Sequence, residues 1–124
     1  MITKHPLFLA LIFAGVEGAV RLVGGSTAAD GRVEIYHDGV FGTVCDDSWD
    51  LPDASVVCKQ LGFPRGAISI PPFNTYPGSE GQIWMDELTC NGEESALSDC
   101  RFDGWGLHNC GHSEDVGVQC QPGA

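Results

Sequence analysis

The stretch FGTVCDDSWD, at residues 41–50, joins a strand-like run to the start of a helix. Apolar and β-branched residues lead to Cys45, and the adjacent carboxylates of Asp46 and Asp47 follow directly. Trp49 then supplies a large apolar side chain. A strand end, a cysteine, two potential cation ligands and a core aromatic therefore lie close together in the chain. We expect the folded domain to be built around this junction.

The segments before the junction predict strands. Residues 20–23 form a short apolar run, and residues 32–36 alternate polar and apolar side chains, which is the period of a half-buried strand. Asp38-Gly39 is a strong hairpin-turn signal, and residues 40–45 read as the returning strand. The hairpin would therefore deliver Cys45 and the two carboxylates to the end of a sheet.

The segment after the junction predicts a helix. Asp50 and Pro52 suit a helix start, because proline is tolerated in the first turn and acidic residues favour the positive end of the helix. The spacing of one buried helical face is followed by Ala54, Val57, Cys58 and Leu61. Gly62 and Pro64 end the helix.

The remaining chain predicts three further strands in a loop-rich domain. We expect strands at residues 67–70, 82–88 and 116–120, and a helical turn at residues 94–97. Residues 71–81 hold several prolines and glycines and read as an exposed loop.

The charge and length of the chain restrict its function. The 124 residues suit a single domain, and the formal net charge is -11. An acidic surface repels phosphate backbones, so we expect no nucleic-acid partner.

The N-terminus predicts secretion. Residues 6–14 form an apolar run that is too short to span a bilayer but suits a signal-peptide core. Small residues at Val16 and Gly18 place the cleavage after Gly18; an uncleaved anchor is the alternative. Residues 1–18 are thus expected to be a signal peptide, and residues 19–124 a single domain with a core at about 20–120 and a short tail. The mature chain has no second long apolar run, so we expect no transmembrane segment in it.

The cysteine pattern points to the same compartment. The chain has six cysteines and no Cys-x-x-Cys pair, so three disulfides are favoured over a structural zinc site. Their spacing alone does not determine which cysteines pair.

Taken together, these landmarks resemble the scavenger receptor cysteine-rich family. The matching stretches are residues 20–25, 31–34, 42–47, 54–58, 60–62, 81–84, 94–95, 105–106 and 115–120, together with Cys90. Six cysteines, and none near Ala29 or Phe63, look like group A of the family. The resemblance implies an α+β fold, in which a curved antiparallel β-sheet cradles one main α-helix. It also implies the disulfides Cys45–Cys110, Cys58–Cys120 and Cys90–Cys100.

The leading candidate site is a Ca²⁺ site. Ca²⁺ takes roughly six to eight oxygen ligands, often from several carboxylates. Similar domains of the family bind it with an acidic pair and a glutamate four residues after the fifth family cysteine, which implies Asp46, Asp47 and Glu94 here. Candidates for a second site are Asp53, Asp86 and Asn91. The alternative is that Asp46 and Asp47 cap a turn and Glu94 begins a helical turn without any metal.

Basic residues are few in the expected domain. Some relatives bind polyanions through an arginine-rich patch, and the cations that could contact a ligand here are Arg32, Lys59, Arg65 and Arg101, of which we select Arg65 and Arg101. The alternative is ordinary surface charge. A bound Ca²⁺ could instead bridge the acidic site to an anionic ligand.

The sequence lacks the motifs of common enzyme classes. It contains no Gly-x-Ser-x-Gly, no His-Glu-x-x-His and no phosphate-binding glycine loop. We therefore expect a secreted, non-catalytic, scavenger-receptor-like module that binds anionic or microbial surface ligands, or an extracellular protein, with help from Ca²⁺. The alternatives are a structural protein–protein interaction module, or the leading domain of a larger receptor or extracellular-matrix protein.

Overall fold

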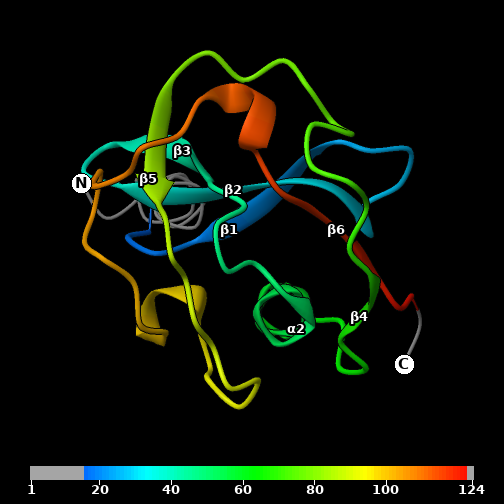
Figure 1. The fold of residues 1–124 in the computed structure, drawn as a ribbon. Coiled ribbons are helices and arrows are strands. Elements are labelled where there is room, and N and C mark those ends of the chain that lie inside the picture. Colours follow the sequence, from blue (N-terminus) through cyan, green and yellow to red (C-terminus); the bar gives the residue numbers. More distant parts are fainter. Residues whose placement is uncertain (1–15, 123–124) are drawn as a thin grey trace, which may run out of the picture.

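The computed structural model describes residues 16–122 of the chain (Figure 1). The predicted signal peptide therefore lies outside the described residues, except for Val16–Gly18. The elements are β1 (Val20–Gly24), β2 (Asp30–His37), β3 (Val40–Val44), α2 (Leu51–Gln60), β4 (Ala67–Ser69), β5 (Gln82–Met85), the short 3₁₀ helices η2 (Leu97–Asp99) and η3 (His112–Glu114), and β6 (Gly117–Cys120).

The strands form one six-stranded sheet with the order β4-β6-β2-β3-β5, and β1 pairs with β2. All pairs are antiparallel except β3 and β5, which run parallel. The expected α+β fold is confirmed. The sheet was expected to be antiparallel, and this prediction is wrong for the pair β3 and β5. Between β3 and β5 the chain passes through α2, β4 and the 70–81 segment. A connection of that length can return the chain to the starting end of the sheet, as a parallel pair requires.

Helix α2 begins as the sequence predicts and packs against the sheet (Figure 1). Asp50 and Asp53 form a reciprocal capping box, in which each carboxylate accepts the other residue's backbone N–H. Of the predicted buried face, Ala54, Val57 and Cys58 are buried, whereas Leu61 caps the end of α2 and is only partly buried. The core on the sheet side is formed by Val33, Ile35, Val44 and Val118.

Strand β2 is buried on both faces, whereas its alternating sequence predicts a half-buried strand. Arg32 and Glu34 are 6% and 5% exposed. The Arg32 guanidinium donates to Glu34 Oε2 and to the carbonyls of Tyr76 and Pro77, so the loop that follows β4 covers this face. Arg32 is therefore not available to a ligand.

Two predicted elements are displaced. Strand β5 stops at Met85 rather than Leu88, because Asp86 turns the chain and Glu87 has a positive φ of 55°. The helical turn expected at residues 94–97 lies at Leu97–Asp99 instead.

Three disulfides join the elements: Cys45–Cys110, Cys58–Cys120 and Cys90–Cys100, the pairs that the family resemblance implies. Cys58–Cys120 ties α2 to the last strand, and Cys45–Cys110 ties the end of β3 to the segment before η3. No helix in the described part of the chain is both long and apolar enough to cross a membrane.

Candidate functional site

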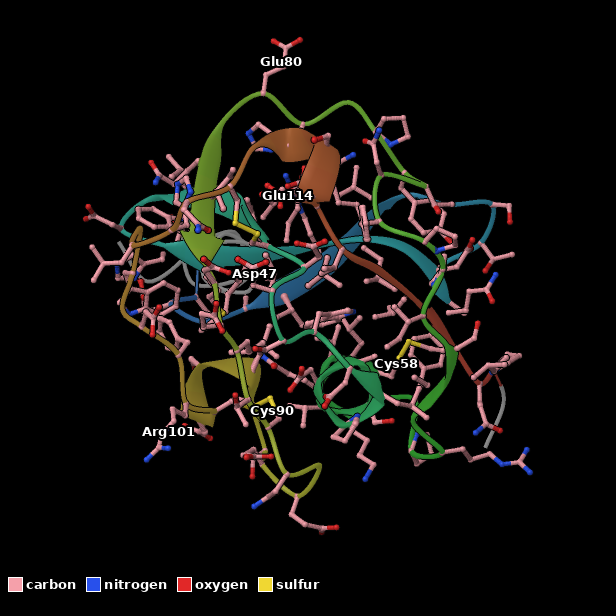
Figure 2. All side chains as sticks on the ribbon, in the orientation of Figure 1. Asp47, Cys58, Glu80, Cys90, Arg101 and Glu114 are labelled. Carbon is pink, nitrogen blue, oxygen red and sulfur yellow. A yellow bond between two sulfur atoms is a disulfide. The ribbon has the colours of Figure 1, made fainter. Side chains whose placement is uncertain are left out.

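The acidic pair after β3 meets a third carboxylate from the other end of the chain. Carboxylate oxygens of Asp46, Asp47 and Glu114 all lie within 4.8 Å of one another. Figure 2 shows Asp47 below Glu114, which projects from η3. Glu114 lies near the acidic pair because the segment after η3 is held beside the end of β3. The hydrogen bond that holds it runs from the Val116 N–H to Val44 O, at 3.0 Å. This arrangement can offer several oxygens to one hard cation.

Asp47 also belongs to a second group of oxygens. Its carboxylate lies within 4.8 Å of that of Asp86, which follows β5, beside the Cys45–Cys110 bridge. One terminal atom of the Asn109 carboxamide lies 3.1 Å from Asp47 Oδ2 and 3.3 Å from Asp86 Oδ2. With nitrogen at this position, Asn109 donates to both carboxylates. With oxygen there, three oxygens converge, which is favourable only around a cation.

The site concentrates negative charge without a compensating side chain. Among the described residues, no arginine or lysine forms a salt bridge with Asp46, Asp47, Asp86 or Glu114. Burial, together with the charges of Glu114 and Asp47, raises the pKa of Asp46. Burial and the charge of Asp47 also raise the pKa of Asp86, although the Glu87 N–H opposes this effect. A bound cation would relieve the charge repulsion that adds to the effect of burial on both pKa values.

Glu94 lies apart from this cluster. Its carboxylate accepts the backbone N–H groups of Asn91 and Gly92, at 3.0 and 3.1 Å, and it lies beside the Cys90–Cys100 bridge. These hydrogen bonds, that of Asn91 first, lower the pKa of Glu94. Asn91 Oδ1 accepts the Glu93 N–H, so both side chains close their own turn. Glu94 and Asn91 thus cap their own turn, whereas the alternative to metal binding had Glu94 begin a helical turn.

Asp53 is the second candidate that the structure uses internally. Its side chain is fully buried, and it accepts the N–H of Cys90 at 2.7 Å as well as that of Asp50. It therefore joins the start of α2 to the Cys90 segment. Of the three candidates for a second site, only Asp86 lies beside the acidic pair.

The basic candidates do not form a patch. Arg101 is exposed and projects at the lower left of Figure 2, away from Asp47 and Glu114. Arg65 is exposed beyond the end of α2, and its carbonyl accepts Gln121 Nε2. Lys59 Nζ donates to Gly92 O.

Glu114 and Asn109 were absent from the sequence-based set of ligands. Asn109 precedes Cys110, and the implied bridge to Cys45 already places it near the acidic pair. Glu114 follows Cys110, the fifth cysteine of this chain, by four residues. Counting the cysteines present in this chain, rather than those of the family pattern, would have selected Glu114 in place of Glu94.

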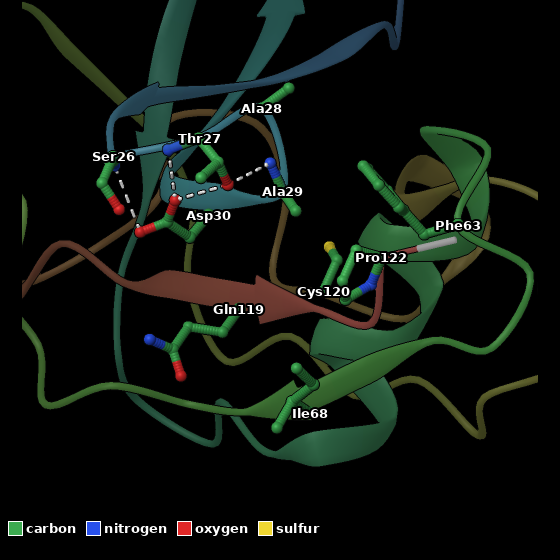
Figure 3. Close-up of a pocket in the computed structure, with 10 residues that line it drawn as sticks. All are labelled: Ser26, Thr27, Ala28, Ala29, Asp30, Phe63, Ile68, Gln119, Cys120 and Pro122. Atoms are coloured by element: carbon green, nitrogen blue, oxygen red, sulfur yellow. Dashed lines mark hydrogen bonds between the residues drawn. The ribbon is translucent and has the colours of Figure 1, made fainter. Parts of the chain in front are cut away.

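A separate hollow of about 520 Å³ lies beside β6 and the end of α2 (Figure 3). Its walls include Phe63, Ile68 and Pro122, and its one carboxylate is that of Asp30. Asp30 already accepts hydrogen bonds from the backbone N–H groups of Ser26 and Thr27. The hollow thus offers no free charged group to a ligand.

Comparison with known proteins gives one consistent family. The model of the scavenger receptor cysteine-rich domain matches residues 23–121. A "Scavenger receptor cysteine-rich domain superfamily protein" of Patiria pectinifera is 53% identical over 104 residues, which are 84% of this chain but 9% of that protein. The chain therefore spans only a small part of that relative's length.

Two solved structures share both the fold and substantial sequence identity. The third SRCR domain of murine neurotrypsin superposes with a TM-score of 0.75 at 43% identity, covering 82% of this chain and 94% of that one. The SRCR domain of mouse MARCO, in its dimeric form, superposes with a TM-score of 0.65 at 43% identity and the same coverage.

Proposed function

Because the chain belongs to the scavenger receptor cysteine-rich domain family, we propose that it is an extracellular, non-catalytic ligand-binding module assisted by Ca²⁺. Three disulfides support an oxidising, extracellular environment, and six paired cysteines support the six-cysteine group of the family.

The observation that carries the proposal is the convergence of uncompensated oxygens at the end of β3. Asp46, Asp47 and Glu114 form one potential coordination site, and Asp47 and Asp86 form a neighbouring pair of carboxylates, to which the Asn109 amide nitrogen donates. Hard oxygen donors in this number suit Ca²⁺ better than a thiolate-binding metal, because the nearby cysteines are paired in a disulfide. We expect a Kd of about 10⁻⁴–10⁻³ M, as in other extracellular modules.

The proposed ligands are anionic or microbial surface groups, or an extracellular protein. The exposed cations Arg65 and Arg101 project from different segments, so a basic patch gives little support to this recognition. A bound Ca²⁺ with open coordination positions would instead bridge the carboxylates to a ligand oxygen.

Calorimetric titration with Ca²⁺ tests the metal site. Wild type should bind, and Asp47→Ala should lose most of the binding heat because Asp47 belongs to both groups. Glu94→Gln is the matched control and should bind as wild type does. Equal heats for wild type and Asp47→Ala would reject the site.

Binding to whole bacteria, lipopolysaccharide and lipoteichoic acid, with Ca²⁺ and with EDTA, tests ligand recognition. Capture that EDTA abolishes is the expected result. Capture that is the same in both buffers would reject the role of the metal.

A second function is favoured by one comparison. Because the match covers 9% of the Patiria pectinifera relative, the chain can also be one domain of a larger receptor or matrix protein that pairs with another polypeptide. A stable co-purifying protein, with no capture of microbial ligands, would support this structural role.

A further inference from the structure

The Cys45–Cys110 disulfide lies inside the proposed cation site. Cys45 directly precedes Asp46, and Cys110 directly follows Asn109. The Sγ atom of Cys110 lies 3.9 Å from Asp47 Oδ2. The bridge therefore joins the two segments whose oxygens face each other across the site.

This bridge is the only disulfide of the Asn109 segment, and the Asn109 carboxamide adds hydrogen bonds to Asp47 and Asp86. In the described structure, the backbone of residues 107–110 makes hydrogen bonds only within its own loop, from Leu107 N to Gly104 O and from Cys110 N to His108 Nδ1. The loop is anchored on one side by Gly106 N donating to Trp84 O, and on the other by the disulfide.

Cys110 is the more exposed of the two residues in this bridge. Cys110 is partly exposed, whereas the other five cysteines are all at most 6% exposed. A thiolate needs access to one sulfur of a disulfide in order to attack it, so Cys110 is the favoured point of attack among the six.

We propose that Cys45–Cys110 is a reducible bridge that controls the cation site, an inference that rests on the proposed function. A dithiol reductant attacks Cys110 Sγ, breaks the Cys45–Cys110 bond and forms a mixed disulfide, and Cys45 leaves as a thiolate that takes up a proton. The second thiol of the reductant then displaces Cys110. In total, two electrons and two protons pass to the protein, and the reductant becomes a disulfide. The segment that leads from Cys110 to Glu114 is then tied less firmly to Asp46 and Asp47, and Ca²⁺ affinity falls.

The order of reduction is the first test, and it needs no metal. The oxidised mature protein is treated with limiting dithiothreitol, trapped with N-ethylmaleimide and mapped by mass spectrometry. Cys45 and Cys110 should be labelled before any other pair. Earlier labelling of Cys58–Cys120 or Cys90–Cys100 would overturn the proposal.

Ca²⁺ titration of disulfide variants is the second test. Cys45→Ser/Cys110→Ser should bind Ca²⁺ at least about tenfold more weakly than wild type. The matched control Cys90→Ser/Cys100→Ser removes the bridge beside Glu94 and should stay within about twofold of wild type. Equal affinity in wild type and Cys45→Ser/Cys110→Ser would overturn the coupling.

A measurement on wild type covers the case in which that variant does not fold. Because linkage is reciprocal, a tenfold loss of affinity on reduction requires saturating Ca²⁺ to make this bridge tenfold harder to reduce, or about 30 mV for two electrons. If wild type bound Ca²⁺ but the reduction midpoint of Cys45–Cys110 did not shift, the coupling would be overturned and the proposed cation site would stand. If oxidised wild type bound no Ca²⁺, the proposed function would fail and the coupling with it.

Discussion

The hydroxyl of Ser48 donates a hydrogen bond to Glu87 Oε1 at 2.9 Å. Both residues have a positive φ, 68° for Ser48 and 55° for Glu87, which is uncommon for residues other than glycine. Ser48 follows Asp47, and Glu87 follows Asp86, so this bond joins the two turns that carry facing carboxylates. A positive φ is unfavourable for these residues, and it persists where the surrounding structure holds the backbone in place.

Removing this bond should weaken cation binding more than it weakens the fold. We expect Ser48→Ala to lower Ca²⁺ affinity about two- to tenfold, since a single hydrogen bond contributes about 0.5–1.5 kcal/mol. The melting temperature in EDTA should change little, because both side chains are exposed. Calorimetry and thermal unfolding would check the two effects, and a lower melting temperature with unchanged affinity would contradict the positioning role.

Cation binding should weaken at mildly acidic pH. The pKa values of Asp46 and Asp86 are raised, so these carboxyls take up protons at a higher pH than ordinary aspartates do. Protons compete with Ca²⁺ for the same oxygens, and affinity should therefore fall as the pH is lowered from 7.4 towards 5. Titrations at several pH values would measure this, and a Kd that is constant over the range would contradict it.

Asp53 should make the fold less stable as the pH rises. Burial raises the pKa of Asp53 from 3.8 to about 7, so the folded state retains a proton that the unfolded chain has already lost. This contribution to stability is complete below the pKa of Asp53 in the unfolded chain, and it is lost as the pH rises through the folded-state pKa of about 7. Asp53→Asn mimics the protonated carboxyl and should remove more than about 1 kcal/mol of this pH dependence, at about 1.4 kcal/mol per pKa unit.

Urea unfolding of wild type and Asp53→Asn at pH 4, 6 and 8 would measure the difference. EDTA in every sample removes any contribution from bound cations. Parallel pH profiles for the two proteins would show that Asp53 has an ordinary pKa.

Arg32 should be among the most sensitive positions for stability. Arg32→Ala leaves the buried carboxylate of Glu34 with only Arg21 as its partner, and it leaves the carbonyls of Tyr76 and Pro77 without their donor. Breaking a buried pair on one side costs about 3–5 kcal/mol. Arg32→Lys should recover only part of the loss, because an ammonium cannot reproduce the planar donor geometry.

Chemical denaturation would measure this cost, with Arg65→Ala as the control. Arg65 is exposed and forms no salt bridge among the described residues, so its removal should change the stability by less than about 0.5 kcal/mol. Similar losses for Arg32→Ala and Arg65→Ala would contradict the structural role of Arg32.

Features encoded by neighbouring residues were predictable from the sequence. The Asp38-Gly39 turn, the Asp50–Asp53 start of α2 and its buried face are all set by contacts a few residues apart. The structure confirms the first two, and it confirms the buried face except at Leu61, which is only partly buried. The placement of the acidic pair at the end of a strand follows from the same local signals. The family was recognisable because its landmarks occur in order along the chain, and the comparisons establish it.

Features that depend on distant segments were decided only by the tertiary structure. The parallel pairing of β3 with β5 and the burial of Arg32 and Glu34 depend on where a long connection returns and what it covers. The composition of the acidic site has the same origin. Asp47, Asp86 and Glu114 are far apart in sequence, and they meet because the sheet and the Cys45–Cys110 bridge bring their segments together. The sequence alone therefore determined that Asp46 and Asp47 stand at the end of a strand. Which oxygens face them was decided by folding, since a cation site depends on distances in space rather than on spacing along the chain.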